Sequence, residues 1–141
     1  MVRRLLGNPA GLFSVAKFEA DLKSLGIPAG RETLYELLAH LEDAFLLRAA
    51  FIAADSEKRK QVNPRKVYPV DHGVSTAFDR SPKANAGHNL EVAVFNELQR
   101  LGAEVGYVKT GSEYEVNFLS RETQGDESAR ICTLVPFQQP W

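Results

Sequence analysis

Acidic residues on one predicted strand and a glutamate on a predicted helix could together hold a divalent cation. In the segment Glu113–Leu119, alternation with a period of two places Glu115 and Asn117 on one face and Phe118 on the other. A helix just upstream carries Glu91 near the edge of its apolar side. Carboxylates are hard oxygen ligands for Mg²⁺ or Mn²⁺, and a metal held in this way activates water in many nucleases. One interpretation is therefore a metal-dependent nuclease.

A second group of residues could bind phosphate. The whole chain has a net charge of −1, which does not by itself indicate a nucleic-acid-binding protein. Five of its basic residues nevertheless fall within one short stretch: Lys58, Arg59, Lys60, Arg65 and Lys66. They could hold a phosphate backbone, or they could be a solvated hairpin tip. Lys66 could instead pair with Asp71, which follows closely in the sequence.

Other kinds of chemistry are excluded by residues that the sequence lacks. It contains no Gly-x-x-x-x-Gly-Lys-Ser/Thr phosphate loop, so we do not expect this chain alone to hydrolyse nucleotides. A single cysteine, Cys132, excludes an internal disulfide and a cysteine-based zinc cluster. The start of the chain has no signal-peptide core, and no apolar run approaches the roughly 18 residues of a membrane span. We expect a cytoplasmic protein that does not enter a membrane.

The elements that would carry the basic residues suggest a helix-turn-helix with a hairpin. Residues 14–25 have apolar positions at helical spacing, with Ser14 as a cap and Gly26 as a stop. Residues 31–44 form a second such helix, and residues 2–6 would be a short first helix. Strands are expected over residues 45–53 and 65–70, with the polar residues 55–64 as a wing loop between them. This order predicts a winged helix over residues 1–72.

The second helix of that pair would be the recognition helix, and its charges argue against binding in the major groove. Arg31 could contact DNA, but the exposed side of the helix also carries four acids. Acidic side chains are repelled by phosphate, and neutralising phosphate dominates DNA affinity. Contact with protein, or packing between domains, is therefore favoured for this helix.

The remaining elements predict an α/β segment over residues 73–141. Residues 71–87 are rich in glycine, serine and proline, which is typical of a linker. A helix follows over residues 88–101, with Leu90, Val94, Leu98 and Leu101 expected on its buried side. Strands are expected over residues 104–109, 113–119 and 129–135.

Motifs in both halves resemble one protein family. Asn63-Pro-Arg-Lys66-Val-Tyr68-Pro-Val-Asp71-His-Gly73 resembles its Lys-x-Tyr-x-x-Asp-x-Gly signature. The helix beginning Gly87-His-Asn-Leu-Glu91 and the strand Glu115-Val-Asn117-Phe118 look like two further motifs of that family. The family is a large group of prokaryotic AAA-type ATPases. In it, a winged helix and then a domain similar to the PD-(D/E)xK nuclease fold follow the ATPase module. The resemblance covers roughly residues 10–120.

Carried over position by position, the resemblance implies an incomplete nuclease site. Glu91 matches the family's helix glutamate, and Glu115 matches the glutamate of its Glu-Val-Asp-Phe strand. Asn117 stands where that strand has an aspartate, and an amide supplies no charge to a metal. The nuclease pattern also needs an acid-x-Lys on the next strand, and residues 129–136 contain neither an acid nor a lysine. The chain ends before that motif, or its tail has diverged.

The sequence therefore predicts an α+β chain: a winged helix-turn-helix followed by a truncated restriction-endonuclease-like core. Its predicted function is that of a non-catalytic binding or remnant module of an ATPase-family protein, without a cofactor. The expected partners are DNA, another protein or an ATPase module, and an open sheet edge would favour a homodimer. The alternative is a DNA-processing nuclease of the PD-(D/E)xK type that binds Mg²⁺ or Mn²⁺ at Glu91 and Glu115. Asn117 would be a vestigial position of this site, which a partner chain or other acids would complete.

Overall fold

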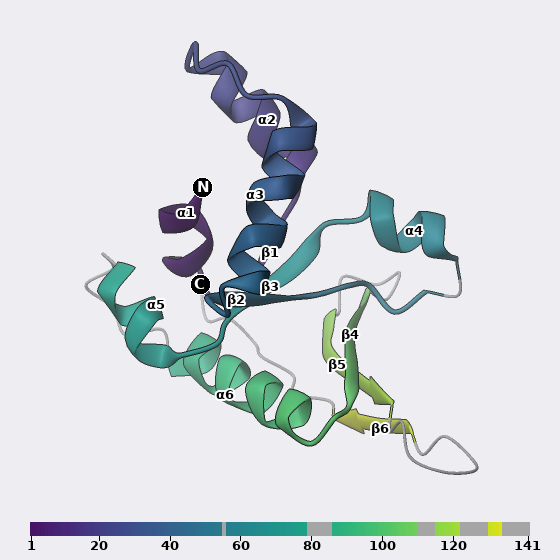
Figure 1. Cartoon of the computed structure of the whole chain (residues 1–141). Helices are drawn as coiled ribbons and strands as arrows, with labels where there is room; N and C mark the ends of the chain where they lie inside the picture. The colour runs from purple at the N-terminus through teal and green to yellow at the C-terminus, as the bar shows by residue number, and fades with distance from the viewer. Residues whose placement is uncertain (55, 79–85, 110–114, 122–129, 134–141) are drawn as a thin grey trace, which may run out of the picture.

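A computed structural model describes residues 1–54, 56–78, 86–109, 115–121 and 130–133. These residues form a mixed α+β structure (Figure 1). The N-terminal elements are α1 (Val2–Leu6), β1 (Gly11–Phe13), α2 (Val15–Ser24), α3 (Arg31–Asp43), β2 (Leu47–Ala50), α4 (Glu57–Val62) and β3 (Arg65–Pro69). The C-terminal elements are α5 (His72–Phe78), α6 (Ala86–Arg100), β4 (Glu104–Lys109), β5 (Glu115–Arg121) and β6 (Arg130–Thr133). Within these ranges every helix is too short or too polar to traverse a lipid bilayer.

The two helices predicted from apolar spacing are confirmed as α2 and α3. Ser14 caps α2, because its Oγ accepts a hydrogen bond from the Lys17 N–H at 3.3 Å. The buried face of the pair consists of apolar side chains at helical spacing: Val15, Phe18, Leu34 and Leu38. Burying this face holds the two helices together, since each would be marginal in isolation.

β3 is the central strand of the first sheet and takes part in two cores. The sheet is antiparallel with the order β1-β3-β2, and its three-residue strand β1 was not predicted. Successive residues of a strand point to opposite faces. Accordingly, Val67 packs in the core with α2 and α3, whereas Tyr68 packs in a second core beneath α6. One strand therefore connects the two halves of the molecule.

The prediction of a wing loop over residues 55–64 is wrong, because a short helix, α4, occupies most of that stretch. Ser56 precedes α4 in an extended conformation, and Lys60 Nζ donates to Glu57 Oε1 at 2.7 Å, one turn earlier. The segment is polar, but glutamate, lysine, arginine and glutamine are also good helix formers. None of the residues of α4 is buried. A polar composition therefore fits an exposed helix as well as it fits a loop.

The predicted linker over residues 71–87 also contains a helix, α5. Asp71 Oδ1 accepts hydrogen bonds from the Gly73 N–H at 2.6 Å and the Val74 N–H at 3.2 Å, which satisfies the start of α5. Ser75 is buried, and its Oγ donates to the Leu6 carbonyl at 3.1 Å. The small residues that suggested a loop instead allow α5 to pack against α1.

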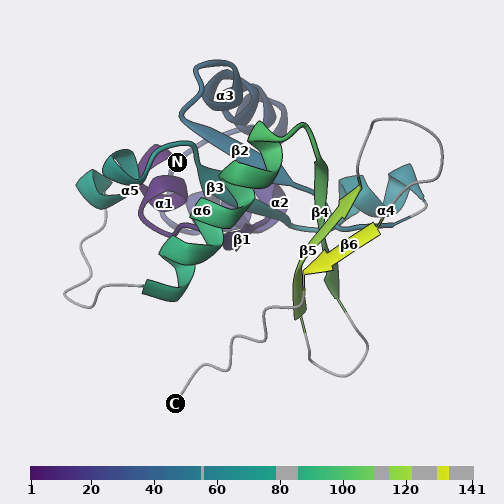
Figure 2. The same cartoon turned by 90° about the horizontal axis from the view of Figure 1, so that it is seen from below.

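The second sheet has the antiparallel order β4-β5-β6 and is joined to the first by the chain that leaves β2. Ile52 forms a parallel bridge with Tyr107 of β4. The Tyr107 N–H donates to the Phe51 carbonyl at 3.0 Å, and the Ala53 N–H donates to the Tyr107 carbonyl at 2.7 Å. Figure 2 shows α6 crossing the first sheet, with the second sheet beside it. The two halves thus share backbone hydrogen bonds as well as a core.

α6 is confirmed as a helix, but its buried side differs from the prediction. Leu90 and Leu101, which were expected to be buried, are 60% and 66% exposed. The buried side chains of α6 include Val92 and Phe95, while Val94 and Leu98 pack partly against the same core. Phe95 stacks on Tyr68 with ring centroids 3.9 Å apart. Because apolar residues occur around most of α6, the aromatic surface of β3 decides which of them are buried.

β5 does not keep the uninterrupted alternation expected of it. Gly106 of β4 faces Leu119, whereas Val108 faces Val116, so two steps along β4 correspond to three along β5. An extra residue of this kind is a β-bulge, which breaks the period of two. Alternation along β5 therefore does not determine which face of the strand Glu115 and Asn117 occupy.

Three helices end with the same backbone motif, and one of them has an unexpected residue in it. After α2 and α6, the glycines Gly26 and Gly102 adopt positive φ angles of 72° and 79°. After α3 the equivalent residue is Phe45, with φ 53°. Its N–H donates to the Glu42 carbonyl, and the next N–H donates to the Leu41 carbonyl, which is the Schellman pattern.

We expect Phe45→Gly to stabilise the protein by about 1 kcal/mol, because it removes a left-handed conformation that disfavours any residue with a Cβ. Little burial is lost, since Phe45 is 70% exposed. Gly26→Ala is the matched control: no atom lies within 4 Å of the added Cβ, so only backbone strain is introduced. It should destabilise by a similar amount in urea denaturation. A less stable Phe45→Gly protein would contradict the expectation.

Candidate functional site

The carboxylate of Glu91 lies inside the molecule and accepts two hydrogen bonds. Lys66 Nζ and the Tyr68 hydroxyl each donate to Glu91 Oε1 at 2.9 Å. The Lys66 and Glu91 side chains are only 6% and 10% exposed. We call this cluster of Lys66, Tyr68 and Glu91 the buried triad.

The spacing of residues on β3 and on α6 places the three side chains of the buried triad on facing sides of these two elements. Lys66 and Tyr68 are two residues apart on β3, so they share the face of the strand that is turned toward α6. Glu91 and Phe95 are four residues apart on α6, so they share one side of the helix. Phe95 stacks on Tyr68 while Glu91 meets its hydroxyl, and Asn96 Nδ2 donates to the Pro69 carbonyl at 3.0 Å. The triad is therefore part of the contact that fixes α6 on the first sheet.

The proposed pairing of Lys66 with Asp71 is wrong. Lys66 pairs with Glu91, twenty-five residues away, and Asp71 accepts backbone hydrogen bonds at the start of α5. Lys66 also lies apart from the surface basic residues with which the sequence grouped it. Arg65 and Lys66 are neighbours on β3 and project from opposite faces, so only Arg65 reaches the α3 side.

A buried ion pair of this kind is better suited to holding elements together than to binding a metal. Leaving either charge buried without its partner is strongly unfavourable, so the two groups hold each other in place. In the part of the chain that the structure describes, no three histidine, cysteine, aspartate or glutamate side chains are close enough to hold a metal ion. Chemically, the triad acts as a brace between β3 and α6.

The other two predicted metal-site positions are described only as backbone. Glu115 and Asn117 lie on β5, where Glu115 pairs with Lys109 of β4. Their side chains lie outside the described part of the structure, as does the segment 122–129 before β6. A metal site that combines them with Glu91 therefore stays a prediction.

The surface basic residues gather around α4 and the start of β3. Lys58 and Arg59 are exposed on α4 and make no ion pair with any residue that the structure describes. Lys60 is partly buried and paired with Glu57. The guanidinium of Arg65 lies 4.6 Å from the centre of the Phe51 ring and 5.6 Å from that of Tyr35. The sequence indicated the charges, but nothing in it indicated that Phe51 would join them.

Arg31 is placed away from this group, at the start of α3, and its charge is compensated. Its Nε and Nη2 lie 2.9 and 2.7 Å from Glu19 Oε2. Hydrogen bonds from Arg31 and then Lys23 hold the pKa of the Glu19 carboxyl below its usual value, so Glu19 stays charged. Because Arg31 is committed to this pair, it contributes little free charge toward phosphate.

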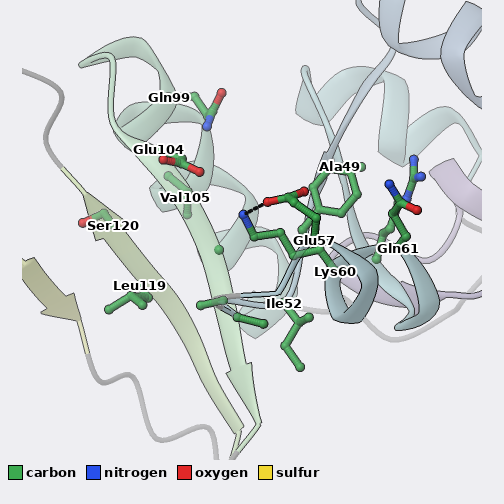
Figure 3. A pocket seen from close by; sticks show the side chains of 15 residues that line it. Ala49, Ile52, Glu57, Lys60, Gln61, Gln99, Glu104, Val105, Leu119 and Ser120 are labelled. Atoms are coloured by element: carbon green, nitrogen blue, oxygen red, sulfur yellow. Dashed lines mark hydrogen bonds and ion pairs between the residues drawn. The ribbon is translucent and has the colours of Figure 1, made fainter.

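A cavity of about 820 Å³ lies between the two sheets (Figure 3). Its walls come from the segment after β2, from α4, from the end of α6, and from β4 and β5. Phe51, Lys60 and Arg65 line it on one side, with Glu104 and Ser120 on the other. Sequence reasoning missed this cavity, because its two walls, residues 49–65 and 99–120, are far apart in the chain.

Comparisons with known proteins give relatives but no function. The chain is 35% identical over 125 residues to an uncharacterised protein of Methanocaldococcus jannaschii, a match that covers 84% of this chain and 27% of the relative. It is 28% identical over 132 residues to an uncharacterised protein of Haemophilus influenzae, covering 94% of this chain and 33% of that relative. No family model and no solved structure matches the chain. The chain thus spans about a quarter to a third of the length of these curated relatives.

Proposed function

We propose that this chain is a non-catalytic binding module of a larger ATPase-family protein. The observation that carries the proposal is the position of Glu91. This residue, which the family resemblance assigns to a nuclease metal site, is buried and hydrogen-bonded to Lys66 and Tyr68. A carboxylate engaged in this way serves the fold.

A nuclease of this type would need a divalent cation at Glu91. Binding Mg²⁺ or Mn²⁺ at Glu91 would bring a second cation next to the Lys66 ammonium, or would force Lys66 out of its buried position. Either change leaves the Lys66 charge poorly compensated in a buried position, and this unfavourable free energy would be subtracted from the metal affinity. The absence of an acid-x-Lys pattern in residues 129–136 points in the same direction.

The arrangement of the N-terminal elements supports a binding role. α2 and α3 with the sheet β1-β3-β2 have the chain order expected of a winged helix, with α4 at the position of the wing. Winged helices are generally recognition modules and lack catalytic groups of their own. The relatives are about three to four times longer than the matched region. This difference in length is consistent with a module within a larger protein.

The proposal is tested by incubating the purified protein with Mn²⁺ and with single-stranded, double-stranded and branched DNA. We expect no cleavage, and no rise in melting temperature when Mn²⁺ replaces EDTA. We also expect Glu91→Gln to lower the melting temperature in EDTA, since the role of the carboxylate is structural. Cleavage that depends on Mn²⁺ and disappears in Glu115→Ala would show that the chain is a nuclease.

A further inference from the structure

Three side chains bring a cation and two aromatic rings together beside the first sheet. The guanidinium of Arg65 lies over the rings of Phe51 and Tyr35. Phe51 is 36% exposed and Tyr35 is 38% exposed, so part of each ring faces solvent. We call these three residues the Arg65 platform. The platform joins α3, β3 and the segment after β2.

The Arg65 platform lies next to α4, a helix that carries three basic residues. α4 ends only three residues before Arg65, and it exposes Lys58 and Arg59. Phe51 and Arg65 line the same cavity as Lys60 of α4. The rings of the platform and the exposed side chains of Lys58 and Arg59 therefore belong to adjoining elements, and α4 lies on the side of the molecule away from α1 (Figure 1).

We propose that this area binds single-stranded nucleic acid, a partner that rests on the function proposed above. Bases of the strand stack on the Arg65 platform, and its phosphates lie along Lys58 and Arg59. Every base has a flat face that stacks on aromatic rings and on arginine, and basic side chains beside such rings follow the backbone. Both parts of this recognition are present on adjoining elements, since α4 lines the same cavity as Phe51 and Arg65.

The charges around the platform favour a single strand over a duplex. In a duplex the faces of the bases are covered by their neighbours, so the rings of the platform would contact none of them. To enter a major groove, α3 would have to bring Glu32 and Glu36, both exposed, close to the phosphates of both strands. A single strand can keep its phosphates on the α4 side and only its bases over Tyr35.

The experiment measures fluorescence anisotropy of labelled oligothymidylate and oligouridylate in EDTA, with duplex DNA of the same length for comparison. We expect both single strands to bind, with an affinity that falls steeply as salt rises. The duplex should bind at least about tenfold more weakly, because stacking on the platform is lost. Binding of only one of the two strands supports the proposal and identifies whether the partner is DNA or RNA.

Matched variants test the two halves of the surface. Phe51→Leu removes a ring but keeps apolar volume and should weaken binding about tenfold, whereas Phe51→Tyr should retain it. Tyr35→Leu, on a different element, serves as the second test if Phe51→Leu does not fold. Arg59→Glu should weaken binding by about tenfold at low salt and reduce the salt dependence. Arg3→Glu makes the same change at an exposed position of α1, which lies on the opposite side of the molecule from α4 (Figure 1), and should leave the affinity unchanged.

The proposal is overturned if no single strand binds at low salt, if the duplex binds equally well, or if Arg3→Glu weakens binding as much as Arg59→Glu. The same oligonucleotides are also incubated with Mn²⁺ and run on a denaturing gel. A strand that is bound and cut would leave this inference standing and remove the non-catalytic function. A strand that is neither bound nor cut would overturn this inference and leave the non-catalytic function standing. The partner would then be sought among proteins.

Discussion

Lys66→Met is expected to destabilise the protein by about 3–5 kcal/mol, the usual effect of removing one partner of a buried ion pair. Without Lys66, the Glu91 carboxylate keeps the Tyr68 hydroxyl but loses the only cation that it is paired with among the described residues. A negative charge with 10% exposure is then left almost without water. Urea denaturation at neutral pH, followed by far-ultraviolet circular dichroism, measures the loss.

A triple variant separates the ion pair from the packing around it. Lys66→Met, Tyr68→Phe and Glu91→Leu together replace every polar group of the buried triad by an apolar one of similar size. Because no charge of the buried triad is left alone, the triple variant should recover most of the stability lost in Lys66→Met. Arg3→Met is the control for loss of a positive charge at an exposed site, and should change the stability by less than about 0.5 kcal/mol. A Lys66→Met protein as stable as the Arg3→Met protein would contradict the assignment of the triad as a brace.

Phe95→Ala is expected to destabilise the protein by about 3–5 kcal/mol, the range found for large buried aromatic residues replaced by alanine. Phe95 is 1% exposed and stacks on Tyr68, while Phe118 of β5 lies 6.4 Å away between ring centroids. Removing the ring leaves a cavity where β3, α6 and β5 meet. Leu90→Ala on the same helix is the control: Leu90 is 60% exposed, and its loss should change stability by less than about 0.5 kcal/mol.

The same variant tests whether the two halves are thermodynamically separate. Since Tyr68 belongs to β3 and Phe95 to α6, the cavity lies between the predicted domains 1–72 and 73–141. We expect differential scanning calorimetry to show one transition that moves as a whole to lower temperature in Phe95→Ala. Two transitions, of which only one moves, would show that the halves unfold independently and that the shared core contributes little.

The buried triad and the Arg65 platform both include residues of β3. Arg65 and Lys66 are consecutive residues of β3 with the same charge, and the pleat sends them to opposite faces. Lys66 is buried and joins the two halves through Glu91 of α6, whereas Arg65 is partly exposed and lies over the rings of Tyr35 and Phe51. A basic cluster in the sequence thus contains both a structural and a candidate binding residue. Mutating the whole cluster at once would confuse a loss of folding with a loss of binding.

The sequence by itself determined the elements whose signals are local. α2 and α3 follow from apolar spacing within each helix, and Gly26 and Gly102 mark helix ends because a left-handed residue is needed there. β3 and β4 were also placed correctly from their composition. In each case the residues that specify the element lie within it or next to it. No distant contact is needed to recognise them.

Only the tertiary structure decided the features that depend on distant partners. α4 and α5 lack the apolar spacing of a longer helix, and α5 forms where Ser75 meets the Leu6 carbonyl. The buried side of α6 is set by the Tyr68 ring, against which Phe95 packs better than Leu90. The sequence did not indicate that Glu91 would pair with Lys66, which is twenty-five residues away. Which charge faces a carboxylate is decided by the fold, because the two groups come from different elements.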